Sequence, residues 1–422
     1  MNRIEKQLAV TGQAGAYQKA WFADLRERIL TRGEPYAIMQ ADTPHEIFHA
    51  MDIPIVTNQW WAAVIAAKQL SPLYFDFLKE QGYHEGLCRY CSLGLAATLH
   101  NDPSIAPWGG LPKPLLLCAR LTCDCVQRVF RLWGDALGAP FFPIDNPGIE
   151  SPSPRWWEDG IENWESLYQP HRLDLMVGQL EELIAFAEQR TGRTFDRAHF
   201  SRMMELIDRQ ETVLGEADRL IAEAPKCPVR VAEQMTNTMT AQWHRGTEWG
   251  LAHATAFRDE VRARVDAGIA AVPNERKRLM WIGAGLWHDT SFYSAFEESH
   301  GAVFTWSMYL PFAFAGYVRR PLTDPMRALA SRVASMNEQL HNPPWINSWL
   351  VHEAQRNRID GALVLMPKSC HPAAASSKFI ARDLEAAGVP VLEIWTDMVD
   401  SRDWDGPAMQ ARVATFLEER LG

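Results

Sequence analysis

Short apolar runs alternate with helix-like segments in two separate parts of the chain, and this alternation constrains the fold more than any other feature. Before residue 150 the runs are YAIMQA, IPIV, KPLLLCARL and APFFPID; after residue 275 they are KRLMWIGAGLW, VFTWSMY, GALVLMP and VPVLEIW. Each run is short enough for a strand, and segments with a helical pattern separate the runs. Because strands and helices that alternate at this spacing form parallel sheets covered by helices, we predict an α/β fold.

The same pattern divides the chain into four predicted parts. Residues 1–34 form an N-terminal helical segment, and residues 35–150 form a first α/β domain that carries a cysteine cluster. Residues 151–275 begin with a Pro-rich loop and continue with periodic Leu, Ile and Met among charged residues, which indicates a helical linker module. Residues 276–422 form a second α/β domain. We expect both sheet domains to be Rossmann- or flavodoxin-like.

Two local signals add detail to this prediction. Thr43, Pro44 and Glu46 have the spacing of a helix start, with the threonine as cap and the proline as first helical residue. The segment SFYSAFEESHGA is predicted as one helix of the second α/β domain.

Cysteines are concentrated near the middle of the first α/β domain. Five of the seven lie within forty residues, and one of the other two follows the strand GALVLMP; the six are Cys88, Cys91, Cys118, Cys123, Cys125 and Cys370. Without a secretory leader, such a group indicates metal or redox chemistry better than disulfides. The alternative is that each buried cysteine acts as a small hydrophobic residue. Cys91 and Cys123 lie near predicted helix starts, where the helix dipole favours a thiolate.

Composition excludes several classes of function. The 422 residues carry a net charge of −10 without a Lys/Arg tract, which disfavours a nucleic-acid partner. No apolar run reaches the length of a membrane span, and the N-terminus lacks the apolar core of a signal peptide, so we expect a cytoplasmic protein. No GxxxxGK[ST] loop occurs, so any ATP hydrolysis belongs to a partner. The 17 tryptophans suit cores, subunit contacts or an aromatic ligand.

Several segments, in this order, resemble the 2-hydroxyacyl-CoA dehydratase and benzoyl-CoA reductase family. They are Pro44-His-Glu-Ile before IPIV, Cys91-Ser92, Cys123-Asp124, RGTEWG, GALVLMPKSCH and TDMVDSRDW. The resemblance implies α/β domains joined by helices, a homologous partner subunit and an acyl-CoA substrate. It also implies one 4Fe–4S cluster per subunit, held by the thiolates of Cys91, Cys123 and Cys370 and supplied with electrons by an ATP-hydrolysing activator.

Within that family, the segment after IPIV favours one branch. In dehydratase-type subunits, a strand similar to IPIV is followed by an acidic residue. In this chain IPIV is followed by Thr57 and then by Asn58, Gln59, Trp60 and Trp61. Paired indoles suit a planar ring, so these last four residues are the candidate substrate-binding segment of an aryl-CoA reductase of the benzoyl-CoA type, which performs low-potential ring reduction. The alternative is a 2-hydroxyacyl-CoA dehydratase subunit that works through a ketyl radical.

Two further assignments stay open. The surplus thiols of Cys88, Cys118 and Cys125 allow a third alternative, an electron-transfer protein with a double-cubane cluster. His371, beside Cys370, is a candidate proton donor because imidazole titrates near neutral pH; otherwise it orients a ligand or fills the core.

Overall fold

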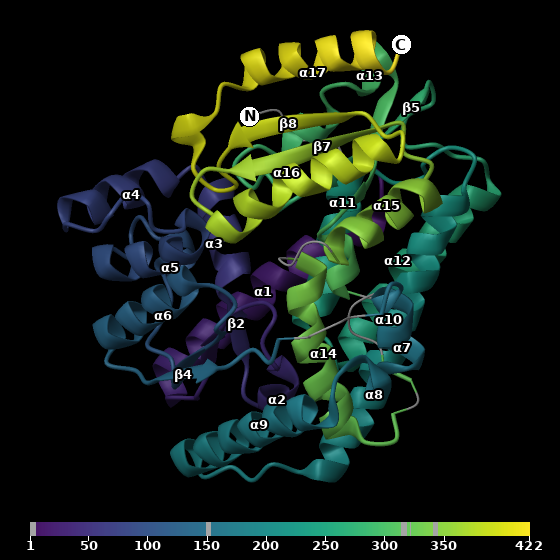
Figure 1. Ribbon diagram of the computed structural model, residues 1–422. Coiled ribbons are helices and arrows are strands. Elements are labelled where there is room, and N and C mark those ends of the chain that lie inside the picture. Colours follow the sequence, from purple (N-terminus) through teal and green to yellow (C-terminus); the bar gives the residue numbers. More distant parts are fainter. Residues whose placement is uncertain (1–5, 149–152, 314–318, 321, 341–344) are drawn as a thin grey trace.

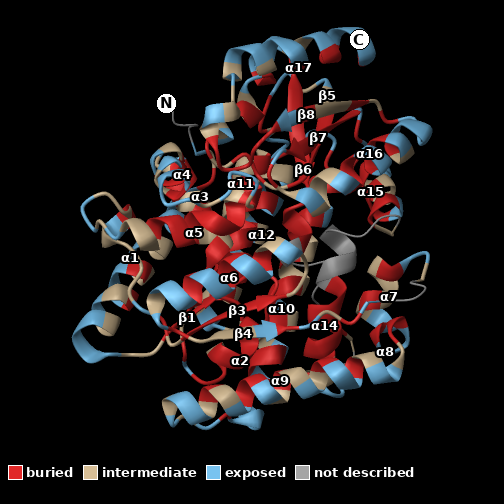
Figure 2. Ribbon diagram, turned by 60° about the vertical axis from the view of Figure 1, so that its left-hand side comes forward, coloured by how far each residue is buried: buried red, intermediate tan, exposed pale blue. Residues whose placement is uncertain are grey.

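The structure is a computed structural model that describes residues 6–148, 153–313, 319–320, 322–340 and 345–422 (Figure 1). It contains two four-stranded sheets, and every strand pair in them is parallel. Figure 2 shows that the strands at the centre of each sheet are buried, with helices around them. The prediction of an α/β protein with two parallel-sheet domains is therefore confirmed.

The first sheet has the strand order β2-β1-β3-β4. Its strands are β1 (Ala37–Met39), β2 (Ile55–Thr57), β3 (Leu116–Arg120) and β4 (Phe141–Ile144). The helices that connect them are α2 (His45–His49), α3 (Asn58–Ala67), α4 (Ser71–Glu80), α5 (Arg89–His100) and α6 (Asp124–Leu137). The strands β1 and β3 are buried along their whole length, because central parallel strands are covered on both faces.

The second sheet has the strand order β6-β5-β7-β8. Its strands are β5 (Lys277–Ile282), β6 (Ala302–Ser307), β7 (Gly361–Pro367) and β8 (Val391–Thr396). The longer helices in this part of the chain are α14 (Pro325–Leu340), α15 (Trp345–Arg356), α16 (His371–Ala386) and α17 (Gly406–Arg420).

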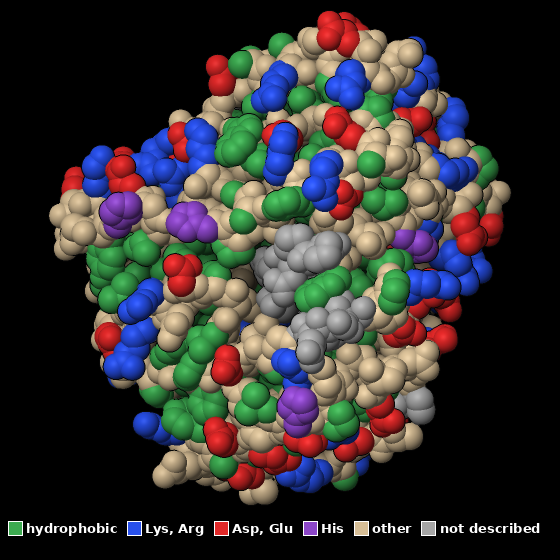
Figure 3. Space-filling model, in the orientation of Figure 1, with side chains coloured by type: hydrophobic (Ala, Val, Ile, Leu, Met, Phe, Trp, Pro, Cys, Tyr) green, Lys and Arg blue, Asp and Glu red, His purple; other side chains and the backbone are tan. Residues whose placement is uncertain are grey.

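Long helices lie between and beside the two sheets in Figure 1. They are α1 (Ala9–Arg32), α9 (Pro170–Thr191), α10 (Arg197–Glu223), α11 (Val231–Trp243) and α12 (Glu248–Asp266), with the short α7 (Trp156–Glu162) and α8 (Trp164–Leu167). Helix α10 packs along α12, α1 lies against α11, and α14 packs on α9. None of the helices in the described part of the chain has both the length and the apolar character needed to cross a bilayer. On the face shown in Figure 3, acidic and basic side chains are interspersed.

Both local signals in the sequence were misread. Pro44 is the cap residue of α2 itself, and the Thr43 hydroxyl donates to the Gln40 carbonyl instead of capping the helix. The segment SFYSAFEESHGA forms a 3-10 turn (Thr290–Ser294) and a short helix α13 (Glu297–His300), not one helix. Here the hydroxyl of Tyr293 accepts the Leu286 amide, which ties the 3-10 turn to the loop before it.

A buried ionic group fixes α2 to the long helices. Both carboxylate oxygens of Glu46 accept from the Arg245 guanidinium, at 2.7 and 3.1 Å, and Arg332 lies 3.1 Å from the first of them. All three side chains are at most 2 % exposed. Burial alone would raise the pKa of Glu46, but Arg245 and Arg332 hold it far below its usual range. This contact joins the PHEI segment to the RGTEWG segment, which are 199 residues apart.

Candidate functional site

Cysteines occupy the starts of three helices that come from both sheet domains. Cys88 is the cap residue of α5 and Cys91 lies in the first turn of that helix. Cys123 caps α6, where its sulfur accepts the Val126 amide at 3.4 Å, and Cys370 caps α16 after strand β7. At each position the chain leaves a strand or loop and enters a helix, so unpaired N–H groups and the positive end of the dipole surround the sulfurs.

The sulfurs of these four cysteines and of Cys125 lie together. The amide of Cys88 donates to the Cys125 sulfur at 3.1 Å, and the Cys88 thiol is hydrogen-bonded to the thiols of Cys125, Cys370 and Cys91. Cys123 lies near enough to feel the charges of Cys91, Cys370 and Cys125. The three sequence-predicted ligands are thus brought together, with two of the three surplus cysteines beside them.

The remaining two cysteines lie apart from this group. Cys118 is fully buried in strand β3, within a separate apolar cluster. Cys227 is buried among the helices, and its thiol donates to the Val229 carbonyl at 3.1 Å. All seven cysteines are free thiols.

The hydrogen bonds of Cys88 divide the group into a donor and acceptors. Its bonds to the other thiols, together with burial, raise the pKa of Cys88 well above its usual range. The hydrogen bond from Cys88 lowers the pKa of Cys125 to about 7, and its hydrogen bond to Cys370 lowers the pKa of Cys370. Burial raises the pKa of Cys123 to about 12. Within the described ranges, no three His, Cys, Asp or Glu side chains are placed to chelate a single metal ion.

Polar contacts between the two domains fix the positions of these thiols. The Ser369 hydroxyl donates to Asp397 at 2.5 Å and accepts the Arg89 amide at 3.2 Å. The Arg89 guanidinium pairs with Asp400 at 3.0 Å and with Asp403 at 2.8 Å. Because Ser369 precedes Cys370 and Arg89 follows Cys88, these bonds set the distance between α5 and the turn before α16.

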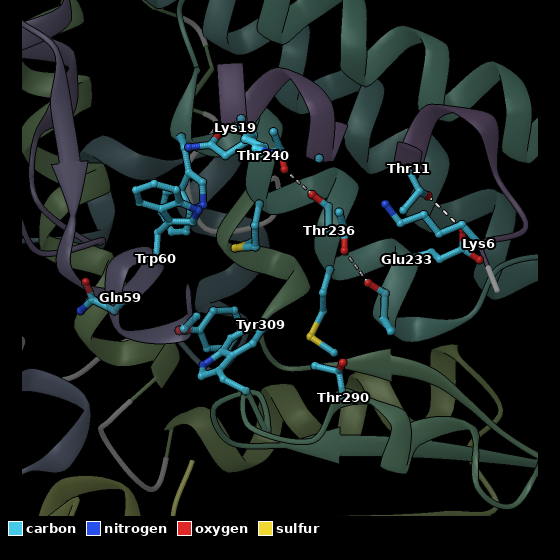
Figure 4. A pocket seen from close by; sticks show the side chains of 18 of the residues that line it. Lys6, Thr11, Lys19, Gln59, Trp60, Glu233, Thr236, Thr240, Thr290 and Tyr309 are labelled. Atoms are coloured by element: carbon cyan, nitrogen blue, oxygen red, sulfur yellow. Dashed lines mark hydrogen bonds between the residues drawn. The ribbon is translucent and has the colours of Figure 1, made fainter. Parts of the chain in front are cut away.

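A cavity of about 550 Å³ lies between helices of the chain, and its lining includes Tyr90, the neighbour of Cys91 (Figure 4). Its walls are largely apolar and include six aromatic side chains, Trp60, Tyr90, Trp108, Trp243, Trp287 and Tyr309. The hydroxyls of Tyr90 and Tyr309 lie 2.7 Å apart and form a polar spot in this wall. Tyr90 directly precedes Cys91. Burial raises the pKa of Tyr309, and the nearby charge of Cys91 raises it further. The tyrosine pair is therefore the part of the cavity wall nearest in sequence and in charge to Cys91.

Two carboxylates that the sequence analysis missed also line the cavity. Glu233 accepts the amides of Gln7 and Leu8, which precede α1, and Asp289 accepts the Ser291 hydroxyl and the Trp404 indole N–H. Figure 4 shows Glu233 at the end of the cavity opposite Gln59 and Trp60. Neither acid stands in a motif: Glu233 reaches the cavity from helix α11 and Asp289 from the loop before the 3-10 turn.

The predicted substrate-binding segment is divided by the fold. Gln59 and Trp60 line the cavity, and the Gln59 side-chain oxygen accepts the Ala41 amide at 2.8 Å. Asn58 is buried, and its amide donates to the backbone carbonyls of Tyr90 and Cys91 at 3.5 and 3.4 Å. Trp61 is buried too, with its ring centroid 5.6 Å from that of Phe22.

The candidate proton donor stands apart from this cavity. His371 is the first residue of α16, is exposed, and is not among the residues that form the walls.

Comparison with known proteins places the chain in a family. Residues 40–419 match the model of the 2-hydroxyglutaryl-CoA dehydratase, D-component family. The chain is 22 % identical over 389 residues to the (R)-2-hydroxyisocaproyl-CoA dehydratase alpha subunit of Clostridioides difficile, which covers 92 % of this chain and 90 % of that one. It is 20 % identical over 390 residues to the (R)-phenyllactyl-CoA dehydratase alpha subunit of Clostridium sporogenes, with the same coverage. The chain belongs to this dehydratase family, which confirms the resemblance seen in its motifs.

Proposed function

We propose that this member of the 2-hydroxyglutaryl-CoA dehydratase, D-component family is the iron–sulfur subunit of an enzyme that removes water from a 2-hydroxyacyl-CoA thioester. The observation that carries the proposal is the group of five thiols beside an apolar cavity. Both relatives are dehydratase alpha subunits, which supports dehydration over the ring reduction that the sequence favoured.

The thiols suit a 4Fe–4S cluster by their chemistry. Cys91, Cys123 and Cys370 would hold the cluster, each near the first turn of a helix whose dipole favours an anionic centre. When bound, such a cluster supplies single electrons at low potential. Cys88 and Cys125 lie beside the three proposed ligands and could bind further iron, which supports the double-cubane cluster as an alternative.

The chain's own residues would bind the substrate and handle its protons. Apolar walls around Trp60 and Trp287 keep water from the acyl group, which strengthens polar contacts inside the cavity. The Tyr90–Tyr309 pair offers a hydroxyl to the thioester carbonyl oxygen. Dehydration takes the hydroxyl from C2 and a hydrogen from C3, without net oxidation. Asp289 is the proposed acceptor of that proton, as a carboxylate on the cavity wall.

Partner proteins complete this proposal. Because the relatives are alpha subunits, we propose that the chain pairs with a second, homologous subunit. Electrons would come from a separate ATP-hydrolysing activator, as the absence of a GxxxxGK[ST] loop in this sequence suggests.

Reduction of an aryl-CoA ring is the second candidate. The observation in its favour is the aromatic cavity wall, with the indoles of Trp60 and Trp108 stacked at 6.0 Å and 17°. Such a wall suits a planar ring in either reaction.

An anaerobic assay of the complex with its partners tests these alternatives. With ATP and a reductant, we expect a 2-hydroxyacyl-CoA to become the 2-enoyl thioester and water. Conversion of benzoyl-CoA to a cyclic diene, with no dehydration, would replace the proposal by the second candidate. Iron analysis tests the ligands separately: Cys91→Ala, Cys123→Ala and Cys370→Ala should each lower bound iron, whereas Cys227→Ala should retain it. Full iron retention in any of the three variants would remove that residue from the ligand set.

A further inference from the structure

A strained tryptophan stands at one end of the cavity. Trp108 has φ +50° and ψ +30°, a left-handed conformation that costs energy for a bulky side chain. The Arg26 side chain holds the turn by donating to the carbonyls of Gly109 at 3.0 Å and Gly110 at 3.3 Å. Gly109 has φ +86°, a conformation that residues with a side chain rarely adopt, so the turn requires glycine there. The chain thus maintains a strained backbone that presents an indole at this place.

Positive charges surround the same indole. Trp108 is 36 % exposed, and the Lys68 ammonium lies 5.4 Å from its ring centroid. Lys19 of helix α1 lines the cavity with Trp108, and Figure 4 shows Lys19 on the same side of the cavity as Trp60. An exposed indole flanked by two lysines offers contacts to an aromatic base and to phosphate groups.

A second cavity of about 350 Å³ shares two lining residues with the first. Lys19 and Trp108 line both cavities, so these two side chains stand between the two spaces. The rest of the second cavity is one face of α1, which includes Arg26, Glu27 and Thr31. Its lining holds two cations, Lys19 and Arg26, against one acid, Glu27, whereas the charged residues of the first cavity are two lysines and two carboxylates.

This sequence of environments follows the chemistry of an acyl-CoA. The acyl group and the pantetheine arm are linear and mostly uncharged, whereas the other end is an adenosine with a diphosphate and a 3′-phosphate. We propose that the second cavity binds this nucleotide end, with Lys19 at the phosphates and the exposed part of the Trp108 indole against the adenine. The inference rests on the proposed function, because it takes the ligand to be a CoA thioester whose acyl end lies near Tyr90.

Binding measurements on the purified complex test this site without catalysis. The probes are CoA, adenosine 3′,5′-bisphosphate and pantetheine, titrated in a calorimeter. Lys19→Ala and Trp108→Ala should each weaken CoA and the bisphosphate about tenfold, the effect of losing one contact to a charged group or one stacked base. Pantetheine, which has no nucleotide, should bind as it does to the unchanged protein. Glu27→Gln should strengthen CoA binding, because it removes the acid that faces the phosphates.

The controls separate the site from the fold and from the proposed function. Lys19 is exposed on α1, so its replacement leaves the fold intact even if Trp108→Ala disturbs the turn. Lys378→Ala, an exposed lysine on α16, is the matched control and should leave CoA binding unchanged. CoA binding that is unaffected in both Lys19→Ala and Trp108→Ala would overturn the site alone. Absence of CoA binding to the unchanged protein would overturn the proposed function with it.

Discussion

The buried carboxylate of Glu46 lies between two arginines in the helical core. Glu46→Gln keeps the shape of the side chain but removes the negative charge between Arg245 and Arg332. Glu211 also contacts Arg332, but burial raises the pKa of Glu211 to about 8, so it compensates only in part for the lost charge. Two guanidinium groups would then share the buried space with less negative charge beside them.

The cost follows from the burial of the three groups. Removing one partner of a buried ion pair destabilises a protein by about 3–5 kcal/mol, since the remaining charge is left in a low dielectric. With about 2.1 cal/mol/K of unfolding entropy per residue, a cooperative unit of 422 residues would lose about 3–6 °C in Tm. Smaller cooperative units would lose more, so this range is the lower bound for the shift.

Thermal unfolding followed by circular dichroism measures this shift. Glu85→Gln is the matched control, because Glu85 pairs with Lys79 on the surface, where both side chains are at least 59 % exposed. An exposed pair contributes about 0–1 kcal/mol, so this variant should stay within about 1 °C of the unchanged protein. If Glu46→Gln also unfolded within 1 °C of the unchanged protein, the reasoning from buried charge would be wrong.

Three further predictions use other parts of the structure. His244 is buried, and that burial lowers its pKa to about 3, so between pH 7 and 5 the unfolded chain takes up a proton that the folded chain does not. The free energy of unfolding should therefore fall by about 2 kcal/mol over this range because of this residue. His244→Phe should flatten the curve of Tm against pH between pH 7 and 5. Ser369→Ala removes the hydroxyl that links the start of α5 to the turn before α16, so bound iron should be lost faster to a chelator under anaerobic conditions, and an unchanged rate would contradict that link. Gly94→Ala would place a Cβ 2.4 Å from the Trp133 indole and should cost about 1–3 kcal/mol, whereas Gly178→Ala, which meets no atom within 4 Å, should be neutral or stabilising in the same denaturation assay.

The sheets could be predicted because their signal is local. A strand such as GALVLMP is buried on both faces and is apolar along its whole length, which is visible in seven consecutive residues. The capping of α2 could not be predicted in this way. Thr43 and Glu46 have the spacing of a capping box, but Glu46 is held by arginines from α14 and from the turn before α12. A partner 199 residues away overrides the local rule.

The site was predictable only where chemistry is concentrated in sequence. Cys91 and Cys123 stood out because they begin helices, and Cys370 because it follows a buried strand. Asp289 and Glu233 gave no signal, since they reach the cavity from separate elements. The segment from Asn58 to Trp61 was predicted as one unit, but successive residues of a helix point in different directions, so only two of its four side chains face the cavity.

Several of the segments that resemble the family contact one another in the fold. TDMVDSRDW supplies Asp397, Asp400 and Asp403, which hold Ser369 and Arg89 and thereby fix the thiols of both domains relative to each other. Neither sheet alone brings Cys91 and Cys370 together, because each thiol belongs to a different domain. If iron binds here, its binding energy also stabilises the contact between the domains. Segments that are far apart in the sequence therefore form one interface between the domains, and the resemblance to the family rests on the set of segments together.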